Sequence, residues 1–172
     1  MIRRFREIIY FIVYVSLQTL VIDHIHLFGI VTPFVYLYVI LKFRMNISRS
    51  SVILLSFLLG LIIDVFSNTF GIHAASCAFI GFIRNPLLGQ FVDMKELPDG
   101  SAPSFRLFGF GKFLRYTMIM VTLHHLLLFL IDSFGFYQPA LLITRLLSSI
   151  FLTLILVCII ESFNLINLKD GE

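Results

Sequence analysis

The sequence predicts an all-α integral membrane protein, with six transmembrane helices in one bundle that forms a single domain over residues 1–172. Three observations predict this class. Hydrophobic residues make up 59% of the chain and charged residues 13%, whereas soluble domains are about half apolar and a quarter charged. The mean hydropathy is +0.98. Six apolar stretches follow one another, and none alternates apolar with polar residues as a membrane β-barrel does.

The first three stretches are the short ones. Residues 8–22 follow three arginines as in a signal peptide, but no small-x-small cleavage site comes after them, so we expect this stretch to be retained as the first helix. Residues 30–43 and 51–64 are short against the roughly 20 residues that a spanning helix needs. We expect these two to borrow flanking residues or to pack against longer neighbours.

The later stretches are longer. Residues 70–92 continue past a proline, and residues 113–134 and 139–163 are long enough to span a bilayer outright. Residues 93–112 form the one sizeable connection, which we expect to be cytoplasmic. Its first half has the Pro, Gly and Ser content of a loop, and its second half mixes Phe with cations, as segments in the headgroup layer do. No connection is large enough for a catalytic domain.

Lysines and arginines alternate between the connections. They precede the first stretch, lie between the second and third, lie between the fourth and fifth (from Arg84 to Arg115) and follow the sixth, while the other three connections hold none. By the positive-inside rule, this places both termini in the cytoplasm. The net charge of +3 is thus spread over membrane anchors, which argues against nucleic-acid binding.

The sequence indicates no cofactor, metal or catalytic group. Cys77 and Cys158 are isolated and are interpreted as packing residues. His124 and His125 are adjacent and point about 100° apart on a helix, so they cannot chelate a metal together as an i, i+4 pair does. Intramembrane proteolysis lacks a nucleophile motif and an oxyanion arrangement.

Ionisable side chains inside the bundle are the candidate functional residues, because each costs about 2.5–3.5 kcal/mol at a helix centre. They gather in the predicted outer half: Asp64, His73, His124, His125 and Arg145. In a structural interpretation, Asp64 caps the fourth helix or meets interfacial water, Arg145 snorkels, and the histidines bond to carbonyls or hydroxyls. In a functional interpretation, they line an outward-facing pocket, with Asp64 and Arg145 as a candidate pair.

Small residues form a stripe on the fourth stretch at spacings of three and four, and a glycine on the third stretch continues it. Such a stripe permits close helix approach in lipid, where no hydrophobic force drives helices together. We favour packing of the fourth stretch against the third over a partner interface. The residues are Gly60, Gly71, Ala74, Ala75, Ala78 and Gly81.

Some of these residues recur in one pattern. Gly60 and Leu61 come shortly before the phrase Asp64-Val-Phe-Ser-Asn-Thr-Phe-Gly-Ile-His-Ala-Ala, and Asp64 and Gly71 lie within it. The pattern resembles that of the MreD family, small rod-shape-determining proteins of the bacterial inner membrane. The likeness extends over nearly the whole chain and includes Gln18 in the first stretch, Pro33 at the entry to the second and the two histidines in the fifth.

The resemblance implies a non-enzymatic, multi-pass protein of the bacterial cytoplasmic membrane that maintains rod shape as a scaffold or regulator of the cell-wall elongation complex. It implies an MreC-like membrane partner, and association with MreB, RodA and a class B penicillin-binding protein. It also implies an architecture similar to the substrate-binding subunits of energy-coupling-factor transporters. The alternative, from another class, is a small-solute binding or transport subunit that uses the pocket around Asp64, His73 and Arg145.

Overall fold

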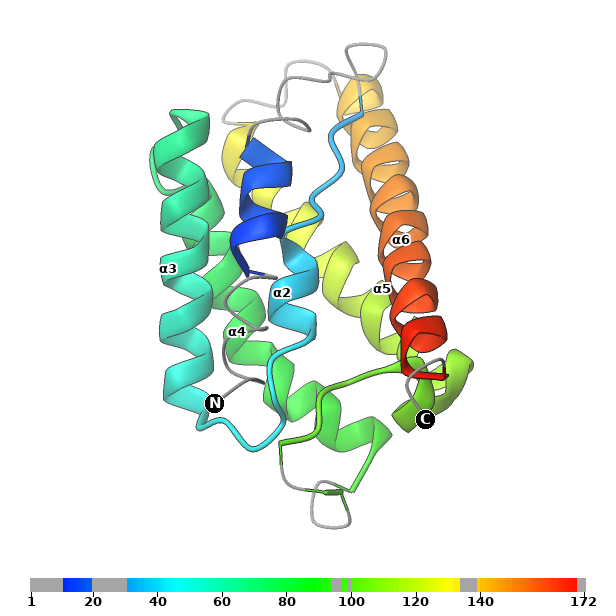
Figure 1. Ribbon diagram of the computed structural model, residues 1–172. Helices are drawn as coiled ribbons and strands as arrows, with labels where there is room; N and C mark the ends of the chain where they lie inside the picture. Colours follow the sequence, from blue (N-terminus) through cyan, green and yellow to red (C-terminus); the bar gives the residue numbers. More distant parts are fainter. Residues whose placement is uncertain (1–10, 20–30, 94–96, 99, 134–138, 170–172) are drawn as a thin grey trace.

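The computed structural model describes residues 11–19, 31–93, 97–98, 100–133 and 139–169, and the figures colour these parts (Figure 1). The described residues form helices and contain no β-strand, which confirms the predicted helical class. Three helices are long and apolar enough to cross a membrane: Arg49–Ser67, Phe105–Asp132 and Ala140–Leu165. Six crossings, and the side on which the termini lie, stay predictions.

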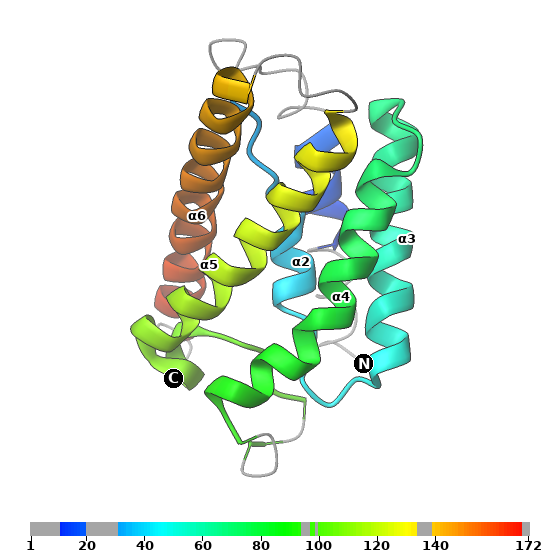
Figure 2. The same cartoon turned by 180° about the vertical axis from the view of Figure 1, so that it is seen from behind.

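Four long helices alternate in direction along the bundle (Figure 1): α3 (Arg49–Ser67), α4 (Ile72–Phe91), α5 (Phe105–Asp132) and α6 (Pro139–Lys169). α3 and α4 form an antiparallel hairpin on one side, and α6 lies on the other. The short helix α2 (Leu37–Leu41) stands between them, and α5 crosses it obliquely, behind it in Figure 1 and in front of it in Figure 2. The connections before α3 and before α5 lie at the same end of the bundle as the last turns of α6.

The α3–α4 hairpin is packed through the predicted small residues. A Cβ on Gly60 would lie 2.6 Å from Cα of Ala74, and one on Gly81 would lie 2.7 Å from Oγ of Ser56. The two helices therefore approach more closely than larger side chains would allow. Gly71 instead adopts a left-handed φ of 79° just before α4 and has open space around it, so its role is to make the turn.

The second stretch does not form the helix predicted over residues 30–43. Only Leu37–Leu41 is helical, and all five residues are buried. The preceding residues, 31–36, are non-helical. Pro33 explains this locally, because proline donates no backbone hydrogen bond and disfavours a helical conformation in the residue before it.

Side chains from distant helices bind the backbone of this irregular segment. An unpaired N–H in a bilayer costs several kcal/mol, so the segment needs such partners. Gln18 both accepts from the N–H of Val35 and donates to the carbonyl of Pro33, at 2.8 and 3.2 Å. On α6, the hydroxyl of Ser149 accepts from the N–H of Thr32, and the hydroxyl of Thr153 accepts from the N–H of Phe34, each at 3.1 Å.

Several predicted bounds also change. The loop predicted over 93–112 ends at Ser104, whose hydroxyl accepts from the N–H of Leu107 and starts α5. Gly109, with a φ of 73°, kinks α5 after its first turn. The predicted stretches 51–64 and 139–163 extend to the bounds of α3 and α6, because helical flanking residues add to the apolar run. The first stretch is helical within residues 11–19, and its ends lie outside the described residues.

Candidate functional site

The carboxylate of Asp64 binds the start of the next helix. Its Oδ1 accepts from the backbone N–H of His73 at 3.1 Å and from the hydroxyl of Thr69 at 2.5 Å, and its Oδ2 accepts from the N–H of Ala74 at 2.8 Å. These N–H groups have no partner within α4, and the residue before the helix is Gly71, which has no side chain to cap it. Asp64 therefore supplies the cap from α3, with its negative charge at the positive end of α4.

Beside this cap, a tyrosine hydroxyl joins two of the predicted histidines. The hydroxyl of Tyr36 lies 2.8 Å from Nδ1 of His73 and 3.0 Å from Nε2 of His124. Because a hydroxyl has one hydrogen, it can donate to only one of the two rings. The thiol of Cys77 is 3.9 Å from the same nitrogen of His124. This arrangement links α4, α5 and the residue just before α2.

His125 belongs to a second branch. Its Nδ1 is 2.8 Å from the carbonyl of Val121, so this nitrogen carries the proton. Its Nε2 is 3.2 Å from Oγ1 of Thr153 on α6. The ring of Phe34 packs against all three imidazoles, with centroid distances of 5.6 Å to His73, 5.7 Å to His124 and 5.0 Å to His125. We call Phe34, Tyr36, His73, His124 and His125 the histidine cluster.

The histidine cluster is closed to solvent. His124 and His125 are each 0% exposed, and His73 is 7% exposed. Nδ1 of His124 is buried without a partner. No group of three or more His, Cys, Asp or Glu side chains in the described parts of the chain is arranged to hold a metal ion. An outward-facing pocket at these residues stays a prediction.

Arg145 does not join the cluster. It lies half-buried near the start of α6, and its Nε has no partner. Within the described ranges, Lys42 and Glu161 form the one ion pair, so Arg145 and Asp64 are not paired there. The structure thus brings together four of the five candidate residues and leaves the arginine apart.

Of the small residues, Ala75 is exposed and Ala78 partly exposed, outside the closest α3–α4 contacts.

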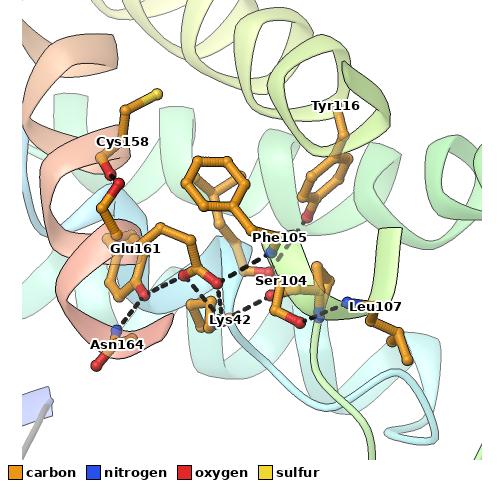
Figure 3. A network of polar contacts seen from close by, with 12 residues as sticks. Lys42, Ser104, Phe105, Leu107, Tyr116, Cys158, Glu161 and Asn164 are labelled. Atoms are coloured by element: carbon orange, nitrogen blue, oxygen red, sulfur yellow. Dashed lines mark hydrogen bonds and ion pairs between the residues drawn. The ribbon is translucent and has the colours of Figure 1, made fainter. Parts of the chain in front are cut away.

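A second buried polar cluster (Figure 3) lies near the last turns of α6, at the end of the bundle that also holds Arg44, Arg49, Arg106 and Lys112 and that we call the basic end. Glu161 of α6 is 2% exposed. Its Oε2 accepts from the hydroxyl of Tyr38 at 2.6 Å and from Nζ of Lys42 at 3.0 Å, and its Oε1 accepts from the N–H of Phe105 at 3.2 Å. Lys42 also donates to the carbonyl of Pro103 at 2.7 Å. One carboxylate thus ties α6 to α2 and to the start of α5.

The sequence analysis did not identify Glu161 as a functional candidate. Glu161 is the one acidic residue in the stretch 139–163, and that isolation is the signal that was available. Its partners come from another part of the chain, so they could not be read from the local pattern.

Arg84 is fully buried and is not the membrane-flanking cation that was predicted. Its guanidinium donates to the carbonyl of Phe43 and to Oδ1 of Asn85. The hydroxyl of Tyr116 donates to the carbonyl of Leu41 at 3.4 Å. The last carbonyls of any helix lack helical partners. Side chains of α4 and α5 therefore bind the buried end of α2.

The two clusters differ in what they can do chemically. The histidine cluster offers hydrogen-bond donors and acceptors in a closed, aromatic space, whereas the Glu161 cluster holds an ion pair near the end of the bundle. Comparison of the chain with protein-family models, curated proteins and solved structures finds no match. The function is therefore inferred from these residues and their geometry.

Proposed function

We propose that the chain is a non-enzymatic, multi-pass component of the bacterial cytoplasmic membrane, a scaffold or regulator of the cell-wall elongation complex like the MreD family that it resembles. One observation carries this proposal. Gly60, Asp64 and Gly71, on which the resemblance rests, all shape the α3–α4 hairpin: close approach, helix cap and left-handed turn. These are structural roles in packing, capping and turning, which supports a scaffold.

The hydrogen bonding of buried polar side chains also supports a scaffold. Buried polar side chains form hydrogen bonds with other residues of the chain, as in Tyr36, Tyr38 and Glu161. A scaffold needs such internal bonding, because an unsatisfied polar group within the membrane is costly. The polar groups fix how the helices pack, and the apolar outer faces remain for lipid and for partners.

The outer face of α6 is the surface we assign to an MreC-like partner with a single membrane helix. In the most apolar window of this helix, 17% of residues are buried, against 33% and 44% in α3 and α5. Exposed apolar side chains recur at every fourth position, which makes a ridge of the kind that packs between helices. They are Ile143, Leu147, Phe151, Ile155, Ile159 and Phe163. MreB, RodA and a class B penicillin-binding protein would join the same assembly.

Cross-linking in membranes tests this assignment. In a variant with Cys77 and Cys158 replaced by alanine, a single cysteine at Leu147 should cross-link to cysteines on the partner's membrane helix. A cysteine at Met118 is the control, because this residue is also exposed but lies on α5. The chain should also co-purify with the partner in mild detergent. Recovery of a monomer from native membranes, with normal rod growth in the deletion strain, would contradict the proposal.

A small-solute binding or transport subunit is the second candidate. The irregular backbone of residues 31–36 favours it, because broken helices form the substrate sites of many transporters. The unpartnered Nδ1 of His124 lies in the same region. A ligand that binds only the folded state raises its stability by about 2.7 kcal/mol at 100 times its dissociation constant. Thermal shifts with vitamins and lipid precursors therefore test it, and a uniform lack of shift would count against it.

A further inference from the structure

A shallow apolar groove runs along the outside of the α3–α4 hairpin, away from both polar clusters. It has a volume of about 340 Å³ and is lined by Ser50, Ile53, Leu54, Phe57 and Ala78. Four of these residues come from α3, and Ala78 of α4 contributes its small side chain from the opposite wall. The α3 part of the lining lies in a helix long and apolar enough to cross a membrane, so the groove faces lipid when α3 spans the bilayer.

A cation stands at one end of this groove. The guanidinium of Arg49 lies over the ring of Phe82, 4.2 Å from its centroid. Arg49 precedes Ser50 in the chain, and Phe82 is one helical turn from Ala78, so the pair closes the groove at the basic end of the bundle. Arg49 is exposed, and no carboxylate in the described segments forms an ion pair with it. Its guanidinium is therefore placed where it can bind an anion at the end of the groove.

We infer that the groove binds one acyl chain of an anionic phospholipid, whose phosphate lies at Arg49. From Arg49 to Phe57 the helix rises about 12 Å, close to half of the roughly 30 Å hydrocarbon core. The groove thus has the depth of one leaflet, with the cation at the level of its headgroups. The ring of Phe82 holds the guanidinium in place through a cation–π contact, and the first N–H groups of α3 add positive charge.

The size of the groove favours a lipid over a partner's helix. A helix segment about 12 Å long and about 10–12 Å wide occupies roughly 1,000 Å³, about three times the groove's volume of about 340 Å³. A helix with its side chains is about 10–12 Å wide and would rest on Leu54 and Phe57 without entering. A hydrocarbon chain, at carbon contact distances of about 3.5–4.0 Å, fits between them. The apolar lining and the cation together match a phospholipid.

Fluorescence quenching by brominated lipids tests the site. The chain contains no tryptophan, so Phe57→Trp provides a single reporter in the full-length protein. The vesicles mix phosphatidylglycerol and phosphatidylcholine, with one or the other brominated on its acyl chains. The indole of this groove reporter should prefer the anionic lipid about five-fold, as one cation near a charged headgroup predicts. Leu61→Trp is the matched control reporter, because Leu61 is equally exposed on α3 but outside the groove.

The preference of the groove reporter should disappear with Arg49→Gln and persist with Arg115→Gln, which removes an exposed cation of α5. Ala78→Leu, which fills the groove but keeps Arg49, should also abolish it. An equal preference at the groove and control reporters, or a preference that survives Arg49→Gln, would overturn the inference. Shielding of the groove reporter from both brominated lipids would overturn it too, because it would place a protein helix over the groove.

Discussion

The Oδ2 atom of Asp64 lies 2.8 Å from the backbone nitrogen of Ala74, across the turn between two helices. In most helices, the residue that accepts from the third N–H is the cap residue itself. Here that position is Gly71, and a residue seven positions earlier replaces it. The cap therefore joins two helices instead of ending one, and its loss should loosen the hairpin as a unit.

Asp64→Ala should lower the free energy of unfolding by about 2 kcal/mol, the upper end of the range for a lost N-cap. The carboxylate accepts three hydrogen bonds, so the alanine variant leaves three donors without it. Unfolding by SDS in mixed micelles measures the change. Asp132→Ala is the control, because it removes an exposed carboxylate from the end of α5. Equal losses in the two variants would show that the cap contributes nothing specific.

Gly60→Ala should destabilise the hairpin by about 1–3 kcal/mol, the usual range for overpacking. The added Cβ would lie 2.6 Å from Cα of Ala74, and backbone atoms cannot rotate away. Gly81→Ala should cost less, because its nearest neighbour is the side chain of Ser56.

Gly89→Ala is the control for the glycine series. Gly89 lies within α4, and a Cβ there would meet nothing within 4 Å. Alanine favours a helix over glycine by up to about 1 kcal/mol, so this variant should be neutral or more stable in the same SDS titration. If Gly60→Ala behaves like Gly89→Ala, the close approach of α3 and α4 is not required.

The long helices could be predicted from sequence because their determinants are local. A continuous apolar run identifies α3, α4, α5 and α6 without knowledge of their neighbours, and the small residues at spacings of three and four indicated the α3–α4 packing. The cap by Asp64 was one of two interpretations left open for that residue. A carboxylate shortly before a helix start is a local feature, so its structural role could be anticipated.

What the sequence did not predict depends on partners far apart in the chain. Residues 31–36 are apolar enough for a helix. Pro33 is a local signal against one, but the bonds from Gln18, Ser149 and Thr153 that stabilise the irregular backbone come from distant parts of the chain. Glu161 and Lys42 are 119 residues apart, and nothing near either residue indicates the other. Such pairings follow from how the helices pack, and no periodicity in the sequence encodes them.

Glu161→Ala should be the most damaging single change at the basic end, with a loss of about 3 kcal/mol, because removing one partner of a buried pair leaves the other charge uncompensated. Lys42, the hydroxyl of Tyr38 and the N–H of Phe105 would all lose their acceptor. The double variant Lys42→Met with Glu161→Gln should lose less than the sum of its single variants. Ser162→Ala, at the exposed neighbouring position, is the control, and strict additivity would argue against coupling.

Tyr36→Phe tests the histidine cluster with little change in shape. The variant removes the hydroxyl that lies between His73 and His124, and buried hydrogen bonds in membrane proteins contribute about 0.6 kcal/mol each, up to about 1.7. We expect a stability loss of about 1 kcal/mol. Nitrogen-15 NMR of labelled histidines should show large shifts at His73 and His124. His125 is the internal control, because its nitrogens face Val121 and Thr153. Equal shifts at all three rings would mean that the cluster rearranges as a whole and that the hydroxyl is not its specific link.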